Sequence, residues 1–203
     1  FLTCGGAVAR PAIVRVRVGT SFREVIAACG GATVEGGVIL VGGPMMGRIE
    51  RDFDAPVTKL TSGIIVLPGD HRLVATLTQS VQRVVRQSKT ACCQCTYCTE
   101  LCPRYLLGHD LEPHKIMRQI NLGLDIPEEV IKGALLCSEC GVCETVACTM
   151  DLSPRLMNRT IKQRLRESGY KGNYAGIGAT ARDMWEYRKV PTDRVINRLG
   201  VAE

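Results

Sequence analysis

The chain has 203 residues, a formal net charge of +6, 45% hydrophobic residues and only 4% aromatic residues. This composition excludes an intrinsically disordered chain, and no apolar run approaches the roughly 20 residues that span a bilayer. The length allows one large domain or two small ones, with cores built mainly from aliphatic side chains. No signal peptide is recognisable, and the chain begins at Phe1 in mid-pattern, as a fragment would.

The first predicted elements are a strand and a helix. Residues 12–18 alternate between aliphatic and charged side chains, which is typical of a half-buried strand. The side chains expected on its buried face are Val14, Val16 and Val18. Ser21 and Glu24 have the spacing of a capping box, so a helix should begin there and end at Gly30 and Gly31.

Two further buried strands are expected at residues 37–43 and 62–68. A strand, a helix and more strands within this short stretch indicate an α+β fold, and we expect a small β-grasp domain over residues 1–68. The glycine-rich stretch 41–48 lacks the lysine of a phosphate loop and the spacing of a dinucleotide fingerprint. We interpret it as a tight turn between strands, with contact to a ligand or partner as the alternative.

Residues 69–90 are predicted to form a connecting helix, and residues 91–168 a second, helical domain. Apolar residues recur at helical spacing in the connecting segment, at Leu73, Leu77, Val81 and Val84. In the second domain, helices are expected to begin at Pro113, Pro127 and Pro154. Ser153 should cap the last of these, whose apolar stripe is Met157, Ile161 and Leu165. Residues 169–203 are predicted as a basic C-terminal extension with a short helix near 192–199.

Nine of the eleven cysteines fall into two tight clusters, which favours a cytosolic metalloprotein over a disulfide-bonded secreted one. The first cluster contains the run Cys92, Cys95, Cys98 and Cys102, followed by Pro103. This spacing is the bacterial [4Fe-4S] ligand run, in which three cysteines bind one cluster and the fourth points to the other. With two such centres bound, the net charge of the chain falls to roughly +2.

The second run repeats the first about 45 positions later, with one extra residue before its last cysteine and no proline after it. It consists of Cys137, Cys140, Cys143 and Cys148. The predicted ligation is crossed. Cluster 1 takes Cys92, Cys95, Cys98 and Cys148, and cluster 2 takes Cys137, Cys140, Cys143 and Cys102. Crossed ligation keeps the two centres close together, as electron transfer requires.

Zinc is the alternative metal, but four-cysteine zinc sites usually consist of two separated C-x2-C pairs, not a triple run with a trailing cysteine. Cys93 is the surplus thiol of the first run, because it cannot replace Cys92 and keep the spacing to Cys95. We interpret it as a bystander, with a redox or rescue role as the alternative. Cys4 and Cys29 are expected to be small core residues.

Other polar patterns are weaker. His109, Asp110, Glu112 and His114 lie together in residues 108–115, and we interpret them as a polar loop before a helix, with a second metal site as the alternative. The basic stripe Arg155, Arg159, Lys162 and Arg166 is expected to be a solvated face, or else to offset cluster charge or dock an acidic partner. No aromatic residues interleave with it, so nucleic acid is not an expected partner. We predict no catalytic residues in this chain.

Four stretches and the two cysteine motifs together resemble a known family, and the four stretches are FLTCGGAVARP, GTSFREVI, VGGPMMGR and PVTKLTSGIIVLP. This arrangement is similar to the C-terminal half of RnfC-like proteins. Within that family it resembles the cobalamin reductases of propanediol-utilisation microcompartments, the PduS type. The resemblance implies an SLBB β-grasp domain followed by a ferredoxin domain. It also implies an N-terminal domain that binds FMN and NADH, whose glycine-rich loop this sequence lacks.

The resemblance implies that the chain is the electron-transfer portion of a flavin- and NADH-dependent cobalamin reductase, and an electron carrier only by itself. NADH delivers a hydride, a flavin splits the pair, and iron–sulfur clusters carry single electrons. The implied partner is a corrinoid adenosyltransferase or other electron acceptor, and a microcompartment shell protein is a further one. The implied location is cytoplasmic, within a bacterial microcompartment. Two alternatives remain open: a peripheral RnfC-type subunit of a membrane electron-transport complex, and a non-enzymatic docking module with structural clusters.

Overall fold

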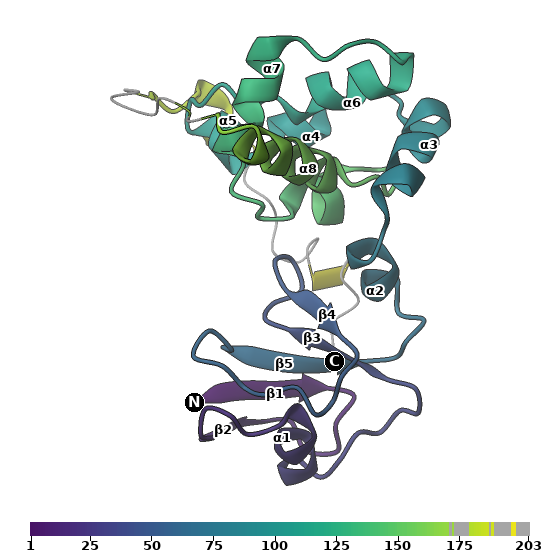
Figure 1. Cartoon of the computed structure of the whole chain (residues 1–203), viewed down its shortest axis with the longest axis vertical. Helices are drawn as coiled ribbons and strands as arrows, with labels where there is room; N and C mark the ends of the chain where they lie inside the picture. The colour runs from purple at the N-terminus through teal and green to yellow at the C-terminus, as the bar shows by residue number, and fades with distance from the viewer. Residues whose placement is uncertain (171, 173–178, 187, 189–195, 198–203) are drawn as a thin grey trace. The chain divides into compact units, whose positions relative to one another are not determined.

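The computed structural model describes residues 1–170, 172, 179–186, 188 and 196–197, and these divide into two compact units. The first unit runs from Phe1 to Thr78, and the second begins at Gln79. Each unit has its own hydrophobic core. Figure 1 shows the strands β1 to β5 in one unit and the helices α3 to α8 in the other. The short helix predicted near residues 192–199 lies outside the described residues, apart from residues 196 and 197.

The first unit is a mixed five-stranded sheet with the order β2-β1-β5-β3-β4. Its strands are β1 (Leu2–Gly6), β2 (Ala12–Val14), β3 (Val38–Val41), β4 (Arg48–Glu50) and β5 (Gly63–Leu67). The central pair β1 and β5 is parallel, and all other neighbours are antiparallel. The predicted strands at 37–43 and 62–68 are confirmed as β3 and β5. The predicted α+β class is also confirmed.

One helix, α1 (Phe22–Ala28), packs on this sheet (Figure 1). Its start is the predicted capping box: the Ser21 hydroxyl accepts from Glu24 N, and the Glu24 carboxylate accepts from Ser21 N. The helix ends where predicted, because Gly30 follows in the left-handed region at φ 86°. The buried side chains of α1 and the strands form one core, which contains Cys4 and Cys29 as predicted.

The strand predicted at residues 12–18 is wrong in length, since only Ala12–Val14 is a strand. β2 is an edge strand that pairs with β1 alone, and the chain leaves the sheet after Val14. Val14 and Val16 still pack on the core, but Val18 is 63% exposed. An alternating pattern therefore marks which side chains face the core, but not where the backbone stops pairing.

The glycine-rich stretch 41–48 is the tight turn that the sequence predicts, because it joins β3 and β4 into an antiparallel hairpin. Gly47 N donates to Gly43 O at 2.7 Å, which closes the turn. A Cβ atom on Gly47 would lie 2.6 Å from Gly43 O and 2.9 Å from Val41 O. Glycine is therefore required at position 47 by the close approach of the backbone.

The single connecting helix predicted over residues 69–90 is wrong. Two helices stand there instead: α2 (Arg72–Leu77), which belongs to the first unit, and α3 (Val81–Ala91), which belongs to the second. Each has its own N-cap, because His71 Nδ1 accepts from Leu73 N and the Ser80 hydroxyl accepts from Arg83 N. Ser80 ends any continuous helix by capping a new one.

The second unit is helical. Its α-helices after α3 are α4 (Tyr97–Glu100), α5 (Pro103–Leu106), α6 (Pro113–Leu122), α7 (Glu128–Gly133) and α8 (Pro154–Glu167). Short turns of other kinds are η1 (Ala134–Leu136), the π-helix η2 (Cys143–Ala147) and η3 (Asp183–Trp185). The predicted starts at Pro113 and Pro154 are confirmed, and the Ser153 hydroxyl caps α8. The helix predicted to begin at Pro127 begins one residue later, at Glu128, and Pro127 is its N-cap.

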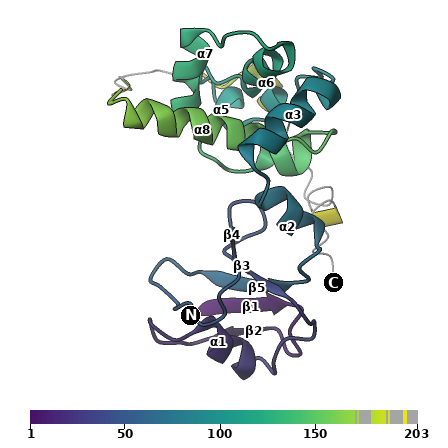
Figure 2. The same cartoon turned by 45° about the vertical axis from the view of Figure 1, so that its right-hand side comes forward.

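Helices α3, α6 and α8 pack together around the core of this unit (Figure 2). Its buried side chains include Val84, Ile116, Met117, Leu152 and Met157. Cys92 and Cys148 pack against the same core, so packing holds the start of the first cysteine loop in place.

The described part of the C-terminal extension packs on α5. Arg182 N donates to Leu106 O, and the Arg182 guanidinium lies 4.0 Å from the centre of the Tyr105 ring. A Cβ on Gly108 would lie 2.2 Å from Thr180 O, so this contact requires glycine. Residues 179–186 are therefore part of the helical unit.

Candidate metal centres

Two loops with matching backbone conformations carry the cysteine runs. In the first, after α3, Gln94 and Thr96 lie in the left-handed region at φ 56° and 65°. In the second, after η1, Glu139 and Gly141 lie there at φ 57° and 83°. These are the same positions of the 45-residue repeat. Left-handed conformations are costly for residues other than glycine, and such strain often marks a functional site.

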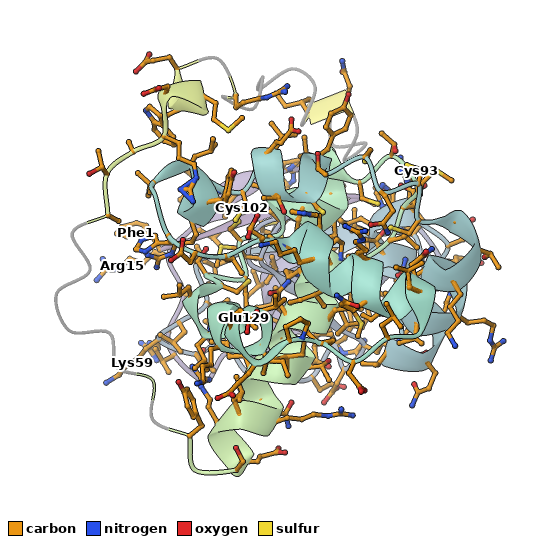
Figure 3. The ribbon with its side chains drawn as sticks, turned by 90° about the horizontal axis from the view of Figure 1, so that it is seen from above. Phe1, Arg15, Lys59, Cys93, Cys102 and Glu129 are labelled. Atoms are coloured by element: carbon orange, nitrogen blue, oxygen red, sulfur yellow. The ribbon has the colours of Figure 1, made fainter. Side chains whose placement is uncertain are left out.

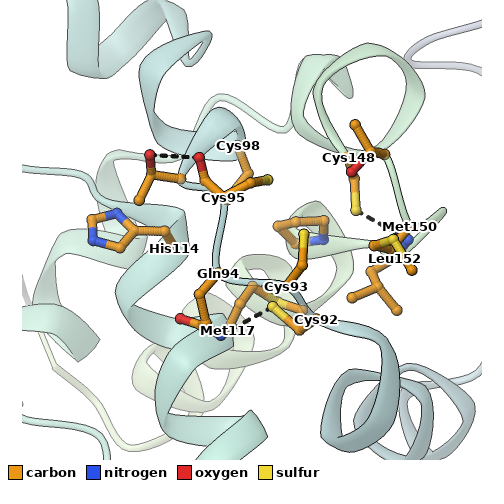
Figure 4. A pocket seen from close by; sticks show the side chains of 13 residues that line it. Cys92, Cys93, Gln94, Cys95, Cys98, His114, Met117, Cys148, Met150 and Leu152 are labelled. Atoms are coloured by element: carbon orange, nitrogen blue, oxygen red, sulfur yellow. Dashed lines mark hydrogen bonds between the residues drawn. The ribbon is translucent and has the colours of Figure 1, made fainter.

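The first loop lines a hollow together with a cysteine of the second run. The thiols that line this first hollow are those of Cys92, Cys93, Cys95, Cys98 and Cys148 (Figure 4). Cys148 reaches it because η2 ends there, and the chain then returns through Leu152 to α8. The remaining wall is largely apolar and includes Met117 and Leu152.

The second loop lines a separate hollow with the last cysteine of the first run. Its thiols are those of Cys102, Cys137, Cys140 and Cys143. Cys102 is 8% exposed and precedes α5, whose first residue is Pro103. Each run therefore places its fourth cysteine among the first three cysteines of the other run. This is the grouping that crossed ligation needs, and the ligation itself remains a prediction.

Burial makes these thiols poor acids while no cation is bound. Burial, and after it the nearby Cys148 thiol, raises the pKa of Cys98 to about 12. Burial also raises the pKa of Cys102, Cys137, Cys143 and Cys148 above the ordinary value. A bound metal core supplies the positive charge that ionises such thiols, so metal binding would release protons here.

Nitrogen donors are already directed at several of the sulfur atoms. Gln94 Nε2 lies 3.1 Å from Cys92 Sγ, Glu139 N 3.4 Å from Cys137 Sγ, and Leu152 N 3.3 Å from Cys148 Sγ. Donors of this kind stabilise a thiolate, because hydrogen bonds to the charged form favour it. Gln94 was not predicted as a site residue, although it occupies the same repeat position as Glu139.

The arrangement fits an iron–sulfur core better than a zinc ion. Zinc needs four sulfur atoms about 2.3 Å from one point. Five cysteines line the first hollow and four line the second. In each hollow, three of them come from one C-x2-C-x2-C loop and one comes from the other run. This donor set suits a four-iron core, which presents a separate iron to each of four thiolates.

Sequence reasoning missed a buried ion pair beside the second hollow, one member of which, Arg155, lines that hollow. Glu144, in the π-helix η2, has a side chain only 1% exposed and pairs with Arg155 of α8 at 2.5 Å. The Ser153 hydroxyl also donates to Glu144. Burial raises the pKa of Glu144, although both partners act against that shift. The available signal was one acid within the otherwise uncharged stretch between Cys143 and Cys148.

The basic stripe of α8 is therefore not simply a solvated face. Arg155 and Lys162 have side chains only 14% and 13% exposed. Lys162 Nζ donates to Cys137 O at 2.7 Å and lies 3.2 Å from Glu139 Oε1. Lys162 thus holds the second cysteine loop, and Arg155 holds η2 after it. Arg159 is exposed but still lies 3.7 Å from Glu139, and Arg166 is exposed as well.

The second metal site considered for residues 108–115 is not formed. His114 shares a hydrogen bond with the Thr99 hydroxyl at 2.8 Å, and Glu112 pairs with Lys115 at 2.5 Å. The Asp110 side chain is 100% exposed. His109 Nε2 lies 3.4 Å from Arg104 Nη1, and Asp110 lies 3.9 Å from Arg182. All four side chains therefore have separate partners, and the polar-loop interpretation is the better one.

Family models match both units. A model described as an SLBB domain matches residues 2–49, and one described as a 4Fe-4S dicluster domain matches residues 91–153. No helix in the described part of the chain has the length and apolar character needed to cross a membrane.

Curated relatives contain both matched regions. "Cobalamin reductase PduS" of Salmonella typhimurium is 45% identical over 99% of this chain, and that of Citrobacter freundii is 43% identical over 100% of it. The chain spans 44% of the length of each. One component of the "Na(+)-translocating ferredoxin:NAD(+) oxidoreductase complex" of Acetobacterium woodii is 36% identical over 52% of this chain and 21% of the relative.

Proposed function

We infer a function from the premise that this chain belongs to the RnfC-like family and is related, within it, to the PduS-type cobalamin reductases. The chain is the electron-transfer portion of a flavin- and NADH-dependent cobalamin reductase. Its two cysteine hollows bind two [4Fe-4S] clusters. They pass single electrons to a corrinoid or to a corrinoid-handling partner such as an adenosyltransferase.

The observation that carries this proposal is the crossed grouping of eight cysteines around two neighbouring hollows. The hollows are neighbours, because α4, which carries Cys98, packs against η2, which begins at Cys143. Bound clusters would supply one-electron carriers at both places. The chain's own part is to hold them near each other, to shield them with an apolar wall, and to direct N–H groups at their sulfur ligands.

The flavin and NADH sites are assigned to the part of the longer relatives that this chain does not span. A hydride donor needs a flavin to divide its electron pair before single-electron carriers can act. We place the protein in a bacterial microcompartment, with a shell protein as a further partner, because its similarity to PduS extends over nearly the whole chain.

Electron acceptance by corrinoid tests the proposal. The chain is loaded anaerobically with iron and sulfide, reduced with a strong chemical reductant, and mixed with an oxidised corrinoid. The visible absorbance lost on reduction should return, and a Cys98→Ser, Cys143→Ser double variant with damaged clusters should show no such cycle. Reduced chain that passes electrons to a ferredoxin but not to a corrinoid would favour the RnfC-type alternative. Clusters that cannot be reduced would favour the docking module.

A further inference from the structure

The first hollow contains one thiol more than a four-iron core can use. Cys93 lines it together with the four expected ligands. Figure 4 shows Cys93 among Cys92, Cys95 and Cys148, around one shared space. Figure 3 shows the labelled Cys93 near the edge of the molecule, in agreement with its exposure. A surplus thiol inside the hollow is a different situation from a lone cysteine on a surface.

Cys93 is placed to share an iron with Cys95, not with Cys92. The Cys92 sulfur is held by Gln94 Nε2 at 3.1 Å. Cys93 lies two residues before Cys95, and both line the first hollow. Cys93 and Cys95 are the two exposed members of the first run, and the other cysteines of the hollow are partly buried. The iron bound by Cys95 is therefore the one that solvent and oxidants reach most easily.

The second hollow provides an internal comparison. Ser138 occupies the repeat position of Cys93, 45 residues later, and it lines the second hollow. The two loops also share left-handed residues at matching positions, so Ser138 and Cys93 stand on similar backbones. The second hollow has the same position without the thiol.

We propose that Cys93 is a reserve ligand, which binds the iron of Cys95 when the bond between that iron and Cys95 is lost. The Cys93 thiol gives its proton to water as its sulfur bonds to iron, and the released Cys95 sulfur takes up a proton. No oxidation state changes in this exchange. The inference rests on the proposed iron–sulfur function and deepens it, since it gives the first centre a repair route that the second lacks.

Iron content of matched variants, after anaerobic loading of the full chain, tests the proposal. With four irons per cluster, the unaltered chain should hold about eight. Cys95→Ala should also hold about eight, and the Cys93→Ala, Cys95→Ala double variant about four. Cys140→Ala should hold about four, because Ser138 cannot replace the thiol. Adding Ser138→Cys to Cys140→Ala should restore about eight.

Alkylation of unbound thiols, mapped by mass spectrometry, identifies the ligand in each variant. In Cys95→Ala, Cys93 should become protected from alkylation. The second-cluster thiols should stay protected in the same sample, which shows that the unit is folded. An unaltered chain that binds no iron would refute the proposed function itself. The reserve role alone would be overturned if the unaltered chain binds two clusters but Cys95→Ala loses the first cluster. It would also be overturned if Cys93 is still alkylated in Cys95→Ala.

Discussion

At the scale of single residues, each hollow takes three ligand thiols from one cysteine run and a fourth from the other run. The cysteine spacing predicted which thiols share a hollow, because a triple C-x2-C-x2-C run forms a tight loop whatever the surrounding fold. It could not predict the pairing of Glu144 with Arg155, since those residues meet only through the π-helix η2 and the start of α8. Nor could it predict that Cys93 faces the hollow, which depends on backbone conformation.

Crossed ligation predicts reciprocal damage in two serine variants. Cys148→Ser should expose Cys92, Cys95 and Cys98 to alkylation and leave the second-run thiols protected. Cys102→Ser should do the reverse, because it removes a ligand from the hollow of Cys137, Cys140 and Cys143. Each variant is the control for the other. Loss of protection within the altered residue's own run would show that each run binds its own cluster.

The buried pair of Glu144 and Arg155 should be costly to break from one side. Arg155→Met leaves a carboxylate buried without its cation, and we expect the second unit to lose about 3–5 kcal/mol of unfolding free energy. Adding Glu144→Gln should recover most of that loss. Chemical denaturation followed by the far-UV circular dichroism of the loaded chain measures both changes.

An exposed ion pair in the same unit is the matched control. Lys115→Met removes the ion-pair partner of Glu112. The side chain of Lys115 is 46% exposed and that of Glu112 is 31% exposed, so the loss of unfolding free energy should stay below about 1 kcal/mol. Equal losses in Arg155→Met and Lys115→Met would contradict the role given to burial.

At the scale of elements, three helix starts were predicted correctly, whereas the start of α3 and the end of the first predicted strand were not. Ser21, Pro113 and Ser153 begin helices as expected, because a cap depends on a few neighbouring residues. β1 was missed although it lies inside the sheet, since its sequence, LTCGG, has a single aliphatic side chain and ends in two glycines, which are disfavoured in strands. The separation of α2 from α3 was missed as well, because apolar spacing continues across a break that a single serine creates.

The hairpin between β3 and β4 should distinguish two of its glycines. Gly47→Ala places a Cβ 2.6 Å from a backbone oxygen, so it should destabilise the first unit by about 1–3 kcal/mol. Gly43→Ala is the control, because its Cβ would have no neighbour within 4 Å. Thermal unfolding of the first unit measures both. Similar effects of the two substitutions would mean that chain flexibility, not the close contact, decides the cost.

At the scale of the whole molecule, the two units differ in what holds them together. The first has a continuous core in which Phe22, Ile39 and Ile64 are fully buried, and no cysteine loop enters it. In the second, helices surround two loops whose non-glycine residues include Gln94, Thr96 and Glu139 in left-handed conformations. Strained loops of this kind persist only when their surroundings hold them, and metal–thiolate bonds would be the strongest restraint available there.

Removal of iron should therefore unfold one unit and spare the other. A chelator added anaerobically to the loaded chain is expected to abolish slow hydrogen exchange in α6 and α8, because metal binding is part of the folding of their unit. Exchange in β3 and β5 should stay slow, since the core of the first unit contains none of the predicted ligands. Mass spectrometry of peptides from each element measures this directly. Equal loss of protection in both sets of peptides would show that the units do not fold independently. Retained protection in both would show that the cysteine loops keep their order without metal.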